Sequence, residues 1–207
     1  ALEREETRND ETVHEMAVTA QGLAHAAEIL AGQFTLVATN VPYLGSGKQD
    51  YVLKDYCERV HPEAKADLAT CFVERCLSFC DSQGSTALVT PQNWLFLGTY
   101  KSLREEMLRT SRFDAIGRLG PKAFQTPMWD FGVSLLLASR VRAQQQHNYA
   151  GIDCADLPGP SEKQDGLIQR VVSLVNQALQ LRNPQAAISF NNEEVGELLE
   201  AIAESVR

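Results

Sequence analysis

Four consecutive residues, Asn40, Val41, Pro42 and Tyr43, could together grip a planar ring that carries an amino group. The Asn40 side-chain oxygen and the Val41 carbonyl can each accept a hydrogen bond from such a group. Pro42 stiffens the turn, and Tyr43 offers a ring face on which a base can stack, a contact worth about 1–3 kcal/mol. Taken alone, however, Asn and Pro also fit an ordinary turn.

The elements that would position this turn alternate along the chain. Short apolar runs predict strands at about 34–39, 86–90, 113–118 and 132–138, and helical periodicity predicts helices over 11–30, 48–60, 67–80 and 100–109. Residues 81–84 indicate a turn. Such alternation predicts an α/β fold with mostly parallel strands. Residues 40–43 directly follow the first strand, and ligands of open α/β sheets bind at the carboxyl ends of strands.

Composition narrows the classes of function. Lys and Arg total 19 against 27 Asp and Glu, a net charge of −8, which disfavours tight electrostatic DNA binding by this chain alone. No apolar run is long enough to span a bilayer, and the acidic start lacks both a signal-peptide core and an initiator Met. We therefore expect a processed or internal piece of a longer protein. We interpret the five cysteines as small core residues of a protein in a reducing cytosol, rather than as zinc ligands. They are Cys57, Cys71, Cys76, Cys80 and Cys154.

After about residue 140 the composition changes. Residues 144–147 and 157–161 look like linkers, and 167–181 and 193–206 have the spacing of amphipathic helices. A boundary is expected between 141 and 150.

The turn at 40–43 resembles the Asn-Pro-Pro-Tyr motif of amino-directed adenine DNA methyltransferases, with Val41 in place of the first Pro. The resemblance continues through three further segments in the same order, at 67–75, 88–96 and 119–124. Residues 12 to 190 together resemble the adenine methyltransferases of BREX phage-defence systems. This ordered set favours the catalytic interpretation of the turn over the ordinary one.

The resemblance implies the C-terminal half of a Rossmann-like, S-adenosylmethionine-dependent methyltransferase sheet, with flanking helices and a helical tail. It divides the chain into a helical lead-in (1–31), half of a catalytic domain (32–145), and a helical linker or start of a target-recognition region (146–207). The resemblance implies catalytic roles for Asn40, Val41, Pro42 and Tyr43. It also implies base stacking by Tyr43 and Phe124, and cofactor contacts by Asn40 and Pro42. No metal is implied. Trp94 and Trp129 are expected to be structural anchors, and Asp67 is expected to cap a helix.

The implied partners are double-stranded DNA with a flipped adenine and other subunits of a defence system. No membrane partner is expected, and the implied location is the cytoplasm. The sequence lacks the Gly-rich strand-to-helix turn that binds S-adenosylmethionine in this family, so the isolated chain is expected to be inactive. Three sheet strands would then lie upstream, and the edge of strand 34–39 would be open to self-association.

The sequence also bears on other classes of function. Gly45-Ser46-Gly47-Lys48 resembles part of a phosphate-binding P-loop, but Pro42 and Gln49 stand where that motif needs Gly and Ser or Thr, which excludes it. Two alternatives stay open: a methyltransferase that acts on RNA or protein amines, and a non-catalytic scaffold of a defence complex.

Overall fold

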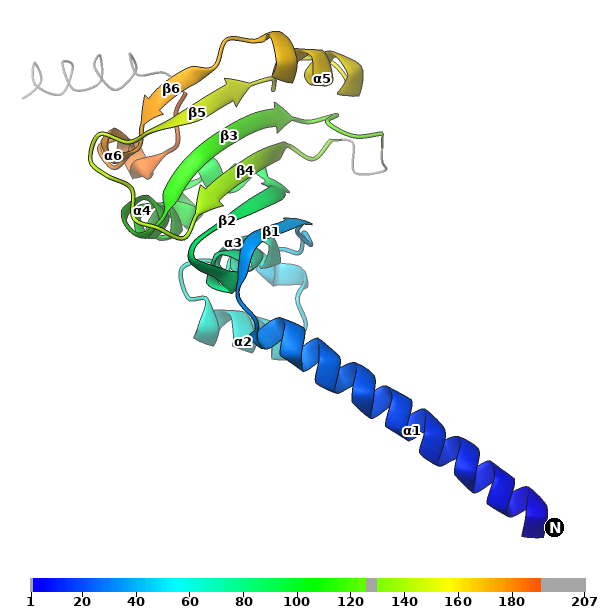
Figure 1. Ribbon diagram of the computed structural model, residues 1–207. Coiled ribbons are helices and arrows are strands. Elements are labelled where there is room, and N and C mark those ends of the chain that lie inside the picture. The colour runs from blue at the N-terminus through cyan, green and yellow to red at the C-terminus, as the bar shows by residue number, and fades with distance from the viewer. Residues whose placement is uncertain (1, 126–129, 191–207) are drawn as a thin grey trace, which may run out of the picture. The chain divides into compact units, whose positions relative to one another are not determined.

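The structure is a computed structural model that describes the backbone of residues 2–125 and 130–190 and the side chains of 13–125 and 130–190 (Figure 1). The chain divides into two compact units, residues 1–33 and 34–207. The first unit is a single helix, α1 (Leu2–Ala31). It begins earlier than predicted, since the Glu and Arg that precede the apolar positions are good helix formers. Its apolar side chains, including Met16 and Leu23, are exposed.

The second unit is built on one six-stranded sheet in the order β1-β2-β4-β3-β5-β6. The strands are β1 (Phe34–Asn40), β2 (Cys80–Pro91), β3 (Arg112–Gly120), β4 (Val133–Ser139), β5 (Asn148–Asp153) and β6 (Ser173–Asn176). The pairings make β1, β2, β3 and β5 run in one direction, and β4 and β6 in the other. Most strands are therefore parallel in direction, as predicted. However, β4 lies antiparallel between β2 and β3, and no helix is found among the described residues that connect β3 to β4.

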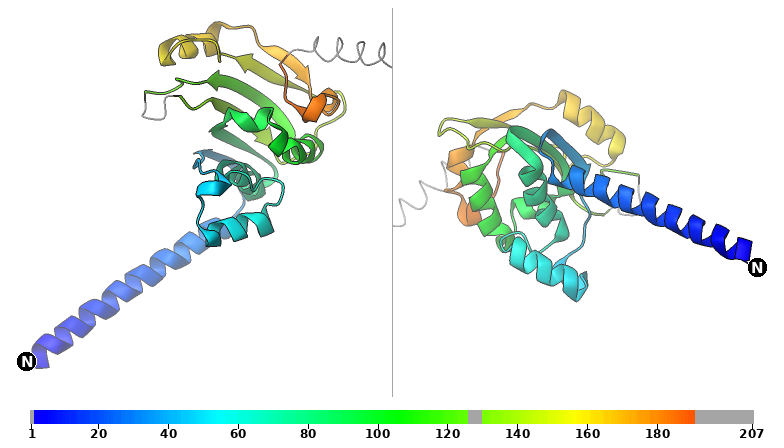
Figure 2. Two further views of the ribbon diagram at one scale, coloured as in Figure 1. Left: turned by 180° about the vertical axis from the view of Figure 1, so that it is seen from behind. Right: turned by 60° about the horizontal axis from the view of Figure 1, so that its bottom comes forward.

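Helices cover one face of this sheet. They are α3 (Leu68–Phe79) and α4 (Lys101–Thr110), and α2 (Tyr51–Val60) adds Cys57 to the same core. The view from behind shows α4 lying across the sheet (Figure 2). The core beneath the helices includes Trp94, Phe113 and Tyr149, whose rings meet edge to face. Trp94 also donates its indole N–H to Thr90 Oγ1 at 3.0 Å, so the prediction of a structural anchor is confirmed for this residue. Trp129 lies outside the described residues.

β2 begins earlier than predicted and includes the segment predicted as a turn. Phe34 pairs with Cys80 and Leu36 pairs with Ser85, so residues 81–84 form an irregularity within the strand. Gly84 is required there, because a Cβ atom would lie 2.5 Å from the Phe34 carbonyl oxygen. The turn chemistry of these residues is thus accommodated inside β2 rather than before it.

The helical tail predicted from residue 146 is wrong in part. β5 and β6 extend the same sheet, and α5 (Pro160–Gln169) and α6 (Gln177–Gln180) are separated by β6, where one helix over 167–181 was predicted. Val175 is fully buried opposite Tyr149 in the pairing of β6 with β5. Sheet pairing therefore overrides the helical spacing. The predicted helix over 193–206 lies outside the described residues, and the division of the chain at 145/146 stays a prediction.

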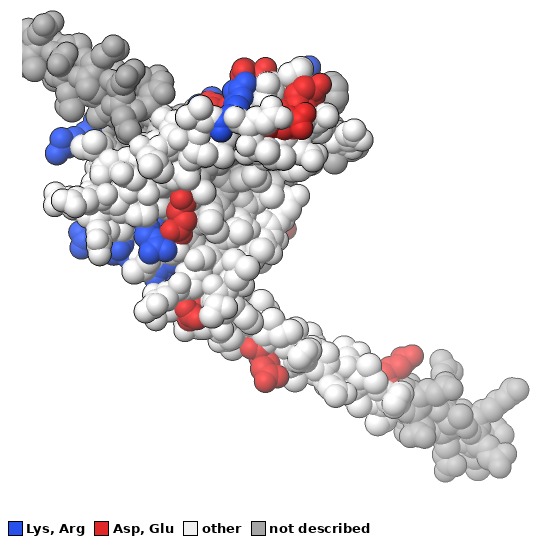
Figure 3. All heavy atoms as spheres, turned by 45° about the horizontal axis from the view of Figure 1, so that its top comes forward, with Lys and Arg blue, Asp and Glu red and all other residues white. Residues whose placement is uncertain are grey.

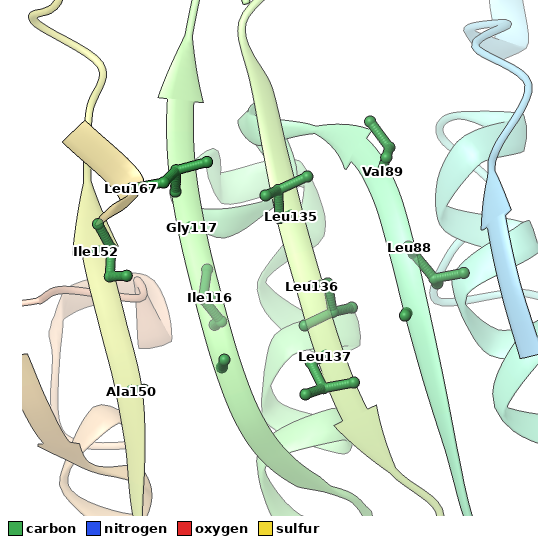
Figure 4. Close-up of a pocket in the computed structure, with 12 residues that line it drawn as sticks. Leu88, Val89, Ile116, Gly117, Leu135, Leu136, Leu137, Ala150, Ile152 and Leu167 are labelled. Carbon is green, nitrogen blue, oxygen red and sulfur yellow. The ribbon is translucent and has the colours of Figure 1, made fainter. Parts of the chain in front are cut away.

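The other face of the sheet carries an open apolar hollow of about 380 Å³. Figure 4 shows side chains such as Leu135, Leu137 and Val89 standing along it, with Ile152 and Leu167 at one side. Leu137 is 37% exposed although it lies on a central strand. Part of this apolar face therefore remains uncovered by the described residues of this unit.

Several further features of the described residues bear on function. All five cysteines are buried free thiols, as predicted for core residues. Within residues 2–125 and 130–190, no cluster of His, Cys, Asp and Glu could hold a metal ion, and no helix has the length and apolarity needed to cross a membrane. The face shown in Figure 3 has small separate groups of Lys and Arg rather than a continuous basic stripe.

Candidate active site

The turn 40–43 lies at the carboxyl end of β1. Asn40 is the last residue of that strand and pairs with Val89 of the parallel strand β2. The carboxyl ends of β2, β3 and β5 lie at the same edge of the sheet. Asn40 and Pro42 are exposed there. The turn is therefore open to a ligand at the edge where α/β sheets bind their ligands.

Val41 anchors the turn to the body of the sheet. Its side chain is 4% exposed and belongs to the main core. Its N–H donates to the Val89 carbonyl at 3.2 Å, which extends the β1–β2 pairing by one residue. None of the described residues donates a hydrogen bond to the Val41 carbonyl, so this oxygen stays available as an acceptor.

Asn40 and Tyr43 are in contact across the turn. The Tyr43 hydroxyl donates to Asn40 Oδ1 at 3.4 Å, a long bond that leaves the second lone pair of the amide oxygen free. The Tyr43 ring stacks on that of Phe131, with 5.5 Å between centroids and 25° between the planes. One face of the Tyr43 ring is thus already used by an aromatic partner.

Asp67 holds the turn against α3. Its Oδ1 accepts from the Ala69 N–H at 2.8 Å, so it caps α3 as predicted. The same oxygen accepts from the Leu44 N–H at 3.2 Å, directly after Tyr43. The Leu44 carbonyl in turn accepts from the Leu68 N–H at 3.0 Å. The turn is therefore fixed by the start of a helix that lies more than twenty residues further along the chain.

The electrostatic setting keeps Tyr43 neutral. Burial raises the pKa of its hydroxyl to about 12, and the negative charge of Asp67 acts in the same direction. The phenol therefore stays a hydrogen-bond donor across the physiological range. This matches the donor role that it has towards Asn40.

The connection between β3 and β4 brings two aromatic residues to this edge. Phe124, which the sequence predicted as a base contact, lies in the first half of the connection and is 41% exposed. Phe131, which the sequence analysis missed, lies near the end of the connection and is 40% exposed. It is the residue that stacks on Tyr43. The only available signal was an aromatic residue placed directly before Gly132 and the strand that follows.

Gln92 holds the end of the connection between β3 and β4, where the chain enters β4. Its N–H donates to the Gly132 carbonyl at 2.8 Å. Its side chain lies so close to Gly132 that a Cβ atom there would be 2.5 Å from Nε2. Gly132 therefore leaves room for the Gln92 side chain directly beside Phe131.

The described residues fit only one side of an S-adenosylmethionine site. Asn40 and Pro42 are exposed where a cofactor would meet the turn. Asp67, the carboxylate that acts on Tyr43, accepts two backbone N–H groups at Oδ1, so this oxygen is already used to hold the turn and α3. The sequence also has no Gly-rich strand-to-helix turn for the rest of the cofactor. These residues could hold the reacting end of the cofactor but not its remainder.

Two curated proteins are similar to about half of this chain. It is 33% identical over 105 residues to the adenine-specific methyltransferase PglX of Lacticaseibacillus casei (strain Zhang), a match that covers 51% of this chain and 9% of that protein. It is 34% identical over 98 residues to the adenine-specific methyltransferase BrxX of Escherichia coli O9:H4 (strain HS), covering 47% and 8%. The matched segment thus spans less than a tenth of the length of either relative.

Solved structures share the fold. One is the methyltransferase subunit of a type I restriction-modification system from Streptococcus thermophilus, with a TM-score of 0.53 and 14% identity over 75% of this chain and 37% of that one. The sheet is therefore that of an α/β methyltransferase, as predicted. The model of the family described as Eco57I restriction-modification methylase matches residues 2–124, which is more than half of the sequence, and the chain accordingly belongs to that family.

Proposed function

We propose that this chain supplies the base-gripping side of an adenine-specific DNA methyltransferase of a restriction-modification or BREX-type defence system. The reaction would transfer a methyl group from S-adenosylmethionine to the exocyclic amine of an adenine flipped out of double-stranded DNA. The observation that carries the proposal is the turn 40–43, open at the carboxyl end of β1, with a second lone pair free on Asn40 Oδ1 and an available carbonyl at Val41. The names of the two curated relatives support the same chemistry.

The acceptors explain how the turn would act on an amine. One N–H of the amine would donate to Asn40 Oδ1 and the other to the Val41 carbonyl. These oxygens favour tetrahedral geometry at nitrogen and stabilise the positive charge that develops there during transfer. Bound S-adenosylmethionine would supply the electrophilic methyl group. Alignment of the amine with that methyl group can contribute about 7–11 kcal/mol in favourable cases.

The aromatic contacts explain how a flipped base would be received. Tyr43 would stack on the base, and Phe131 covers a face of Tyr43 in the described state. The base would replace Phe131 on that face, or enter between the two rings as they separate. Phe124, on the same connection, would pack against the edge or the far face of the base. Both phenylalanines are partly exposed, as this exchange requires.

The test is methyl transfer by the full-length protein with labelled S-adenosylmethionine and unmethylated double-stranded DNA, with N6-methyladenine identified by mass spectrometry. Asn40→Ala should lower the rate by about 100-fold or more, as loss of a transition-state acceptor does. The melting temperature should not change, because the Asn40 side chain is exposed. Thr35→Ala, at an exposed position of the same strand, is the matched control and should keep full activity.

The same assay separates the alternatives. Methylation of RNA or of protein amines, but not of DNA, would assign the site to another class of methyltransferase. A full-length protein that binds S-adenosylmethionine and DNA but transfers no methyl group would be a non-catalytic scaffold. Either result would contradict the proposal. If it holds, the enzyme would act in the cytoplasm together with other subunits of its defence system.

A further inference from the structure

A buried lysine lies next to the start of the connection between β3 and β4. Lys163 of α5 is 2% exposed, and its ammonium group donates to the carbonyls of Leu119 and Cys154, the latter at 3.0 Å. Leu119 is at the carboxyl end of β3, and Cys154 directly follows β5. β3 and β5 are neighbouring parallel strands. One cation therefore joins two strand ends at the edge where the candidate active site lies.

This arrangement is a costly way to gain stability. A buried charge loses its hydration, and here burial lowers the pKa of the ammonium group. No carboxylate forms an ion pair with Lys163 among the residues that the structure describes. An apolar side chain of similar length often serves the free energy of unfolding as well as a buried charge does. What the lysine provides in addition is a fixed position for the two carbonyl groups.

Leu119, whose carbonyl Lys163 holds, lies directly before the connection between β3 and β4. Gly120, the next residue after Leu119, has φ 68°, and Lys122 has φ 59°, so the chain turns sharply here. A Cβ atom on Gly120 would lie 2.8 Å from Ala155 Cα, next to Cys154. Ala123 then packs with Leu119 in a small second core. The start of the connection is thus held closely against the segment that Lys163 fastens.

We propose that Lys163 is a positioning residue for the target base: by fastening the end of β3, it sets where the first half of the β3–β4 connection presents Phe124 at the edge of the sheet that carries the turn 40–43. The inference rests on the proposed function for its substrate, and it gives a role to a segment that the sequence analysis interpreted as a linker. Lys163 itself would touch neither the base nor the cofactor.

The experiment compares two buried cations in the full-length protein. Lys163→Met removes the fastening, and Arg104→Met is the matched control. Arg104 is also fully buried and donates to the backbone carbonyls of Trp94 and Leu97, but on the helix-covered face. Two quantities are measured for each variant: the KM for unmethylated DNA, and the rate of tryptic cleavage after Lys122, identified by mass spectrometry. The second needs no methyl transfer.

Lys163→Met should raise the KM for DNA by about 10-fold, since small displacements of positioning groups have effects of this size or larger. It should also speed cleavage after Lys122 at temperatures below its own melting transition. Arg104→Met should lower the melting temperature but leave both quantities unchanged below its transition. If Lys163→Met does not fold, Gly120→Ala displaces the same point of the chain and should give the same two effects.

An unchanged KM and unchanged cleavage after Lys122 in Lys163→Met would overturn the inference, as would equal effects in Arg104→Met. The proposed function fails separately, if the wild-type protein transfers no methyl group to DNA. In that case the cleavage rate alone still decides whether Lys163 fastens the connection.

Discussion

Val41 shows how a residue can serve the turn through its backbone. Its N–H donates to the Val89 carbonyl at 3.2 Å, a bond that Pro cannot make. Val41→Pro, which restores the resemblance to the Asn-Pro-Pro-Tyr motif, should therefore cost about 0.5–1.5 kcal/mol of unfolding free energy. We expect a lower melting temperature and no gain in methyl transfer, because Val already supplies the carbonyl. Thermal unfolding and the methylation assay check both.

The control for this variant is Val41→Ala, which keeps the N–H and loses only side-chain packing. A Val41→Pro protein that melts like the wild type and methylates faster would contradict the prediction. It would indicate that the valine at this position weakens an active turn.

Tyr43 should make unfolding dependent on pH in the alkaline range. Its folded pKa is raised to about 12 from the ordinary value of 10.0. Below pH 10 the phenol is neutral in both states, whereas between pH 10 and 12 it ionises in the unfolded chain first, which favours unfolding. The melting temperature of Tyr43→Phe should therefore fall less than that of the wild type when the pH is raised from 8 to 11. Equal losses would show that burial does not perturb this phenol.

Elements with a strong local signal could be predicted from the sequence. α3 has both its apolar spacing and its Asp67 cap within one stretch of chain, and β1 ends in the Asn and Pro that stop a strand. β6 could not be predicted, since it depends on Val175 lying opposite Tyr149, a pairing that local spacing does not encode. The candidate site divides in the same way. The turn 40–43 was visible, whereas the contact of Phe131 with Tyr43 exists only after the strands assemble.

β1 is an edge strand with an exposed apolar side chain. It pairs with β2 on one side, and none of the described residues pairs with its other side. Leu36 is 59% exposed on it. Since open edges invite pairing with another chain, we expect the 207-residue chain to self-associate through β1. Leu36→Lys should shift the mass measured by light scattering towards the monomer.

The control for this edge is Leu174→Lys on β6, the strand at the other edge of the sheet, where the leucine is 62% exposed. It should leave the association unchanged. Equal effects of the two variants would indicate that general hydrophobicity, and not the β1 edge, drives the association. A wild-type chain that stays monomeric at every concentration would contradict the prediction outright.

The distribution of charge across the chain fits a component that acts within a larger protein. The net charge is −8, and the face in Figure 3 has only scattered basic groups. DNA affinity depends on neutralising phosphates with Lys and Arg. If the proposed function is right, most of the phosphate contacts would therefore come from outside this chain. The chain would contribute the grip on the base and its alignment.

Cofactor binding tests that division of labour directly. In the 207-residue chain, Asn40 and Pro42 are exposed where the reacting end of S-adenosylmethionine would lie, but no Gly-rich strand-to-helix turn is present to hold the rest. We therefore expect titration calorimetry to detect no binding of S-adenosylmethionine to this chain, and clear binding to the full-length protein. Micromolar binding by the chain alone would mean that its own residues form the cofactor pocket. Asn40→Ala should then weaken that binding, and the role of Asn40 would move from the amine to the cofactor.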